Sequence, residues 1–314
     1  MKKRILSLLL ALVMLVGLLP TVSLAADGDP TKQVHVTVEN TTFTEASEAS
    51  NWLAPAWSGK EIDTWITLTD DLTMMDCIRM AIVEKGWTQS GAENGYISDI
   101  NGVGEYDNGG DSGWMGTLND WFTNYGFAHY KVSDGTLKPG DEIRVMYTSV
   151  GKGKDLGGEW GGSDKRVKSI DVTGGTLAPA FTSDNHEYTL TLPAGKQTAD
   201  VTVVPTAVNK QYQVHTYVGE TEYRRTESIP VTPGTVITVK SGDPSWETAN
   251  PNTAPAEVYT INVVTPGAML NKDSLSITTI KEDTTGTGAN IKLTYNEDTA
   301  TFSGTLSAYT HLTQ

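Results

Sequence analysis

The chain has 314 residues, of which 38 are acidic and 23 basic, so its net charge at pH 7 is −15. An acidic balance argues against a nucleic-acid backbone or an anionic membrane as partner, because like charges repel. The one cysteine, Cys77, permits no internal disulfide, so we expect stability to come from β-sheet cores. Exported eukaryotic domains of this size normally contain several disulfides, which favours a bacterial source.

Residues 1–26 are predicted to form a secretory signal peptide. Three basic residues at 2–4 precede an apolar run over 5–19, and cleavage is expected at the small residues Ala25 and Ala26. The apolar run is too short for a good membrane span. We therefore expect an exported protein, secreted or held at the cell surface, with no membrane span after signal cleavage.

The first domain is predicted over residues 27–150, with a strand followed by a helix and further strands. Valines at 34, 36 and 38 alternate with polar residues, which is typical of a strand with one buried face, and His35 on the other face is expected to meet solvent. Apolar residues then recur at three- and four-residue spacing between 74 and 82, which predicts one amphipathic helix. The stretch 69–73 offers caps for its start, and Gly86 ends it. On the buried face Cys77 is expected to be a small hydrophobe.

The later part of this domain contains a second strand signal. The stretch 96–103 is predicted to be a strand with a turn at Asn101-Gly102, and Pro139-Gly140 form a tight turn before an alternating strand over 143–147. Between them, Gly113-Trp114-Met115 place a large aromatic residue beside glycine, where backbone can approach a ligand closely.

The sequence Gly113-Trp114-Met115, with Asn119 and Gly140-Asp141, resembles the pattern of the small β-rich domain related to the C-terminal domain of transcobalamin and intrinsic factor. The resemblance covers roughly 34–148. It implies a β-grasp-like α+β fold with ligand-binding aromatic loops around Trp114. In transcobalamin-like proteins this domain covers one face of a corrin ring while an α/α-barrel holds the other. That barrel is not seen in this sequence, so no cofactor is predicted, cobalamin included.

Six glycines between 151 and 162 predict a flexible linker over 151–165 and a domain boundary. Short alternating strands separated by Gly, Pro, Asn and Asp follow, which predicts an antiparallel β-sandwich over 166–265. The stretches 174–181, 187–190 and 259–263 resemble the bacterial cadherin-like β-sandwich module, which implies an Ig/cadherin-like fold. Its carboxylates are isolated, so no calcium site is predicted.

Residues 266–314 are rich in Thr and Ser and contain strand-like stretches. At this length an independent core is marginal. The segment is expected to be a partial β-rich segment, either an incomplete third domain or one completed by packing on the sandwich. The expected fold class is therefore mainly β and multidomain.

No catalytic constellation is predicted. Gly110-Asp111-Ser112-Gly113 matches the sequence around the nucleophile of chymotrypsin-like proteases, but the only upstream mature histidine, His35, lies in mid-strand. The acidic stretch 107–111 lacks the ligand spacing of an EF-hand, and the five histidines never fall at metal-ligand spacing. We expect a glycine-rich turn at Ser112, no metal site and no enzyme activity.

Aromatic residues are the unusual enrichment, since six of the eight tryptophans lie in the first domain. Flat apolar faces with polar edges suit sugars, peptides and planar ligands. The predicted ligand-binding residues are Trp52, Trp57, Trp114, Trp121 and Tyr125. Burial of most of these rings in the core is the competing interpretation, and Trp52 and Trp57 lie in a polar loop that no core pattern includes.

These patterns together predict a secreted or cell-surface, non-catalytic binding or adhesion protein, with a binding module on a β-sandwich spacer. Its partner is expected to be an extracellular glycan, peptide or small molecule, or the cell wall. Two alternatives stay open. In the first, the chain is an accessory fragment of a larger extracellular enzyme or of a cobalamin-type binding protein. In the second, it is a purely structural cell-wall protein.

Overall fold

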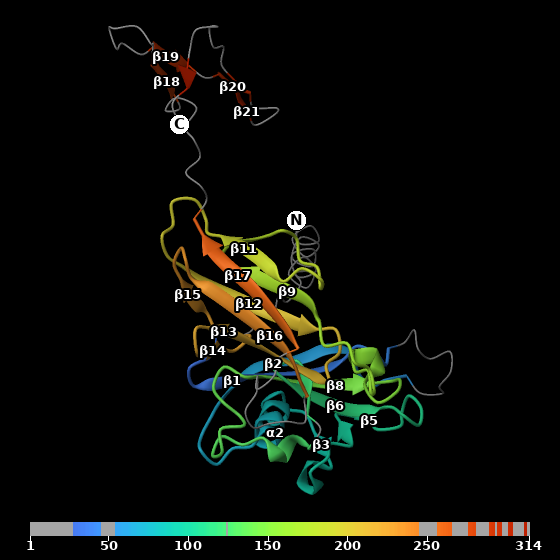
Figure 1. Ribbon diagram of the computed structural model, residues 1–314. Helices are drawn as coiled ribbons and strands as arrows, with labels where there is room; N and C mark the ends of the chain where they lie inside the picture. The colour runs from blue at the N-terminus through green and yellow to red at the C-terminus, as the bar shows by residue number, and fades with distance from the viewer. Residues whose placement is uncertain are drawn as a thin grey trace, which may run out of the picture.

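The computed structural model describes residues 28–44, 54–123, 125–244 and 256–265, with five short strands between 276 and 312 (Figure 1). Over these residues the chain is mainly β, with several sheets and one α-helix. The predicted signal peptide and Trp52 lie outside the described residues. Within the described part of the chain, no helix has the length and apolar character needed to cross a membrane.

A five-stranded mixed sheet forms the first unit. Strand β1 pairs antiparallel with β2 and parallel with β8, and β8 pairs antiparallel with β6. The spatial order is β2, β1, β8, β6, β7, with bounds Gly59–Thr67, Gln33–Asn40, Glu142–Thr148, Gly113–Leu118 and Trp121–Phe122. Figure 1 shows helix α2, Met74–Glu84, below this sheet and the second unit above it.

Helix α2 begins where the sequence predicts. Thr73 is its N-cap, and a capping box joins the Thr73 side chain to the backbone of Asp76 at 3.2 Å and the Asp76 carboxylate to the backbone of Thr73 at 3.0 Å. Lys85 caps the other end, and Gly86 takes the left-handed conformation with φ +77°. Cys77 is fully buried, and burial raises the pKa of its thiol to about 12, so it is a core residue.

The alternation in β1 separates an apolar face from a polar one. Val34, Val36 and Val38 are fully buried in the core shared with α2. The expectation that His35 meets solvent is wrong, because its Nε2 lies 2.6 Å from the Asp63 carboxylate on β2. The register also pairs His35 with Glu142 on β8. Neighbouring strands therefore supply acidic partners that a single strand pattern does not reveal.

The stretch 96–103 forms less strand than predicted. A small sheet contains β3, β4 and β5, with bounds Gln89–Ser90, Asp99–Ile100 and Val103–Gly104. The predicted turn at Asn101-Gly102 is present, with φ values of +50° and +83° that suit a tight hairpin. Tyr96 lies outside the strands and is 45% exposed.

Two sheets around one hydrophobic cluster form the second unit. The larger has the order β10, β11, β17, β16, β13, β14, with bounds Thr176–Ala178, Glu187–Thr191, Glu257–Val264, Val236–Pro244, Tyr212–Val218 and Thr221–Tyr223. The smaller has the order β15, β12, β9, with bounds Ile229–Val231, Ala199–Ala207 and Val167–Thr173. Strands β11 and β17 are parallel, so the prediction of purely antiparallel pairing is wrong at this pair.

The glycine-rich segment 151–165 is held by hydrogen bonds. It contains a short 3-10 helix, η4, Lys154–Leu156, whose Asp155 accepts a hydrogen bond of 2.6 Å from Thr148. The backbone of Gly153 donates to the same threonine at 2.9 Å. The segment thus packs against the end of β8, although its glycine content predicts a flexible linker.

Short strands continue after the second unit. Strands β18, β19 and β22, with bounds Ser276–Ile280, Ala289–Lys292 and His311–Leu312, make one sheet. Strands β20 and β21, Thr294–Asn296 and Thr301–Ser303, pair antiparallel. The strand content expected for this segment is therefore present.

The capping box generates a stability prediction. Replacing Thr73 by alanine removes the acceptor for the Asp76 backbone and is expected to lower the unfolding free energy by about 1 kcal/mol. Urea unfolding followed by tryptophan fluorescence measures this loss. Thr69→Ala, which removes only an exposed hydroxyl bound to Asp71, is the matched control. Equal stability of the two variants would show that the box contributes nothing.

Candidate functional site

The turn between β6 and β7 carries an acidic group into the junction of the two units. Asn119 and Asp120 both have positive φ, at +49° and +77°, as a two-residue hairpin turn requires. The Asp120 side chain is only 4% exposed and pairs with Arg144 at 3.2 Å. It also pairs with Lys210 and, at 3.6 Å, with Arg225, both from the second unit. A single buried carboxylate is thus paired with basic side chains from both units.

The loop after β14 holds the turn before β8. Arg225 donates to the Glu142 carboxylate at 3.0 Å, and Arg224 pairs with Asp141 at 2.8 Å. Thr226 donates to the carbonyl of Gly140. The Gly140-Asp141 pair, which the sequence identifies as a turn before a strand, is therefore a contact point between the units.

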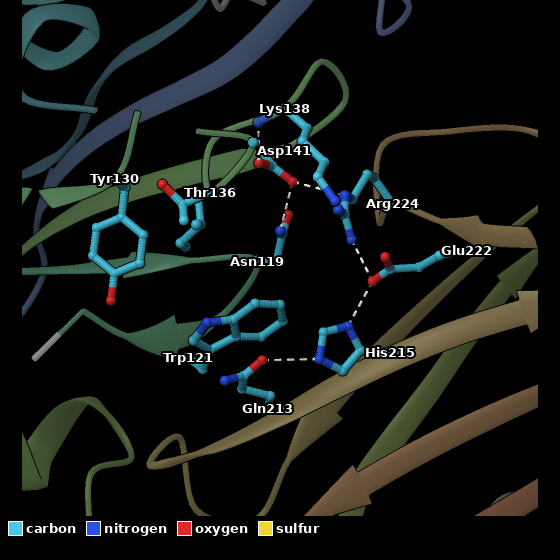
Figure 2. A pocket seen from close by; sticks show the side chains of 12 residues that line it. Asn119, Trp121, Tyr130, Thr136, Lys138, Asp141, Gln213, His215, Glu222 and Arg224 are labelled. Carbon is cyan, nitrogen blue, oxygen red and sulfur yellow. Dashed lines mark hydrogen bonds and ion pairs between the residues drawn. The ribbon is translucent and has the colours of Figure 1, made fainter. Parts of the chain in front are cut away.

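A cavity of about 80 Å³ lies beside these ion pairs. Figure 2 shows an unbroken chain of contacts along its wall, from Gln213 through His215, Glu222 and Arg224 to Asp141 and Asn119. Trp121 and Tyr130 complete the lining, and the buried Tyr130 hydroxyl has no hydrogen-bond partner among the described residues. The volume suits a few water molecules, which would satisfy this hydroxyl.

The charges at the junction shift the titration of their neighbours. Burial alone would raise the pKa of Glu142, but His35, whose Nδ1 lies 3.9 Å from the carboxylate, and the charge of Arg225 lower it to about 2. The pKa of Glu222 is likewise about 2, because burial is outweighed by the hydrogen bond from His215 and the charge of Arg224. Burial lowers the pKa of His35, yet its two carboxylate partners raise it overall. Glu142 and Glu222 are therefore held in their ionised forms, whereas burial raises the pKa of Asp141 despite the charge of Arg224.

An open cleft of about 420 Å³ lies on the first unit, away from the cavity of Figure 2. Tyr96, Tyr106 and Trp114 supply its aromatic lining, and Glu105, Asp111 and Lys152 supply charged groups. Tyr106 is 62% exposed and has φ +68°, an unusual conformation for an aromatic residue. Its position is fixed because its backbone N–H donates to Ser112 at 3.1 Å and its carbonyl accepts from Gly109 at 3.1 Å. Strain of this kind concentrates at functional positions.

The other tyrosine of the cleft is a constant hydrogen-bond donor. Burial and the neighbouring Glu105 raise the pKa of Tyr96 to about 12, so its hydroxyl keeps its proton. Below it, the hydroxyl of Tyr147 donates to Gly104 at 2.9 Å and lies 3.0 Å from that of Ser112, which ties the loop to β8. The cleft thus has exposed aromatic side chains, and hydrogen bonds fix the backbone beneath them.

Two of the predicted binding residues lie together, Trp114 in the core and the partly buried Trp57 packed against it. Trp57 and Trp114 stack with ring centroids 5.6 Å apart, and their indole N–H groups donate to Ile100 and Val103 carbonyls at 3.0 and 2.9 Å. Trp57 also contacts Trp87 at 4.7 Å. Trp114, although 3% exposed, forms part of the floor of the cleft.

The other predicted residues lie apart. Trp121 is buried at the junction, 5.0 Å from the ring of His215. Tyr125 is 56% exposed, packs on His129 at 5.0 Å and lines neither hollow. Sequence reasoning did not select Tyr96 or Tyr106, and no sequence signal separates them from Trp114 and Phe127, which also follow a glycine but are buried.

Ser112 is held as a turn residue. Its hydroxyl donates to the carbonyl of Gly109 at 2.8 Å and accepts from the backbone of Asn108 at 3.1 Å. Histidine is not among its described partners, so the geometry of an activated nucleophile is not formed there. Within the described ranges, no three metal-ligating side chains are grouped to hold an ion.

No protein-family model, no curated protein and no solved structure matches this chain. Inferences about its function therefore start from the geometry of the two hollows.

The junction generates a prediction on pH. Glu222 has an ordinary pKa of 4.5 and a folded value of about 2, so its contribution to stability is complete above pH 4.5 and is lost as the pH falls toward 2. The raised pKa of His35 contributes stability that is complete below 6.5 and is lost as the pH rises through the folded value. The unfolding free energy is therefore expected to be highest between pH 4.5 and 6.5.

Chemical unfolding across this pH range provides the measurement. Glu222→Gln is expected to flatten the acid side of the profile, by about 3 kcal/mol at most, and His35→Gln the alkaline side. Glu220→Gln, on the exposed end of the same hairpin, is the control. A Glu222→Gln profile that parallels the control would contradict the assignment.

Proposed function

We propose that the chain is an exported, non-catalytic binding protein that takes a carbohydrate at the cleft around Tyr96 and Tyr106. The observation that carries the proposal is the exposure of two tyrosines on two neighbouring, hydrogen-bonded loops, one of them with an unfavourable backbone conformation. An exposed aromatic ring held in a strained loop costs stability, which a ligand contact explains.

The chemistry of the cleft favours a sugar. Tyrosine faces stack on the apolar faces of sugar rings, while Glu105, Asp111 and the protonated Tyr96 hydroxyl offer acceptors and a donor for sugar hydroxyls. The net charge of −15 favours a neutral glycan over an anionic one. Lys152 is the one cation in the lining, beside two carboxylates.

The fold supports the domain types expected from the sequence. The order β2, β1, β8, β6, with β1 parallel to β8 and a helix between β2 and β6, is that of a β-grasp-like domain. Asn119 and Asp141, two residues of the transcobalamin-like pattern, are hydrogen-bonded at 2.7 Å. Two sheets around a single core support an Ig/cadherin-like sandwich as the second domain. On this proposal the sandwich is a spacer fixed to the binding domain.

A purely structural role is the second candidate. It is favoured by the burial of Trp114 and Trp121, which removes two rings from the set of available contacts. On that alternative the exposed tyrosines contact no ligand, and their replacement changes no binding.

Glycan arrays and calorimetry with the full mature chain test the proposal. Tyr106→Ala is expected to weaken binding of neutral glycans about tenfold, because it removes one stacking face. Tyr125→Ala, with a similarly exposed ring outside the cleft, is the matched control and is expected to bind normally. Binding that survives Tyr106→Ala but fails in Tyr125→Ala would place the site elsewhere, and no binding to any glycan would favour the structural role.

A further inference from the structure

A third exposed ring stands beside the cleft, on the segment that joins the two units. Trp160 is 47% exposed. It occupies the second position of a turn over 159–162, in which Gly162 donates to the carbonyl of Glu159 at 2.8 Å. The next residue, Gly161, has φ +92°, as the third position of a type II turn requires.

The turn that carries Trp160 is anchored to the second unit. Asn209 accepts from the backbone of Glu159 at 3.1 Å and donates to its carbonyl at 2.9 Å. The hydroxyl of Tyr212 donates to the carbonyl of Gly162 at 3.0 Å. Both ends of the turn are therefore fixed, and the indole is presented from a rigid support.

Lys152 connects Trp160 to the cleft. The Trp160 indole N–H donates to the backbone carbonyl of Lys152 at 2.9 Å, and Lys152 itself lines the cleft with Tyr106. The inner side of the indole packs near Phe122, with ring centroids 6.0 Å apart. The hydrogen-bonding edge of the ring is thus occupied by the protein, while about half of the residue's surface stays exposed one residue contact from the cleft, through Lys152.

We infer that the binding surface extends from Tyr96 and Tyr106 across Lys152 to Trp160, and that its ligand is a chain of a neutral polysaccharide. This inference rests on the proposed function. Two aromatic platforms separated by a polar residue fit successive sugar rings, each stacked on one platform, with hydroxyls between them. A single sugar occupies only the cleft, so the second platform has a use only for a longer chain.

Calorimetry with the full mature chain tests this inference. Neutral gluco-, manno- and chito-oligosaccharides, from disaccharide to octasaccharide, are the probes. For the series that binds, affinity is expected to rise with chain length, and Trp160→Ala is expected to remove about a tenfold gain while leaving disaccharide affinity unchanged. Trp160→Phe is expected to keep most of the gain, and unchanged disaccharide binding shows that the variant is folded.

The outcomes separate this inference from the proposal beneath it. If Trp160→Ala keeps the full dependence on length while Tyr106→Ala weakens every oligosaccharide, the cleft binds sugar but the extended surface is refuted. If no oligosaccharide binds, or if only peptides bind, the extended surface and the proposed carbohydrate-binding function are both refuted. If Tyr106→Ala weakens all lengths equally and Trp160→Ala only the longer ones, the extended surface is established.

Discussion

The arrangement of the two units depends on one buried carboxylate. Asp120 stands on a two-residue turn of the first unit and accepts cations from both units, namely Arg144, Lys210 and Arg225. Removing charges from water is costly, and such pairs repay that cost only with good geometry. A junction built in this way tolerates few relative orientations, because a shift would remove Lys210 and Arg225 and leave Asp120 buried with Arg144 alone. We interpret the network as a device that fixes orientation more than one that adds stability.

The small cavity follows from this fixed arrangement, whereas the open cleft is built within the first unit and its connecting segment. At the junction, the groups that could contact a ligand already contact one another, and the small remaining volume suits water. On the outer side, Thr148 holds the segment 151–165 against the end of β8, and Asn209 and Tyr212 of the second unit hold the turn that carries Trp160. The orientation of the units therefore determines where Trp160 stands relative to the cleft. A binding surface shared between a domain and its connecting segment needs such rigidity.

Local patterns predicted most of the secondary structure and little of the site. The helix from Met74 and the strands of the first sheet follow from periodicity and capping, which depend on neighbours within a few residues. The environment of His35 depends on Asp63 and Glu142, which only the strand register brings close. Likewise, Trp57 looked free because its loop shows no periodicity, yet its indole donates to a distant carbonyl at Ile100. Aromatic exposure is a tertiary property, so the sequence left open which rings are buried, and the structure buries Trp114 and Trp121 and leaves Tyr125 exposed.

The polar character of the upper face of the first sheet has a consequence for biogenesis. A chain is synthesised from its N-terminus, so the first unit can fold before the second has appeared. At that stage the face awaiting the second unit presents the carboxylates of Glu142 and Asp120 to water beside the indole of Trp121. Exposed apolar faces on folding intermediates promote aggregation, whereas a charged face stays hydrated until its basic partners arrive. The charged groups that join the two units in the complete protein therefore also keep this face of the first unit hydrated while the second unit is still unfolded.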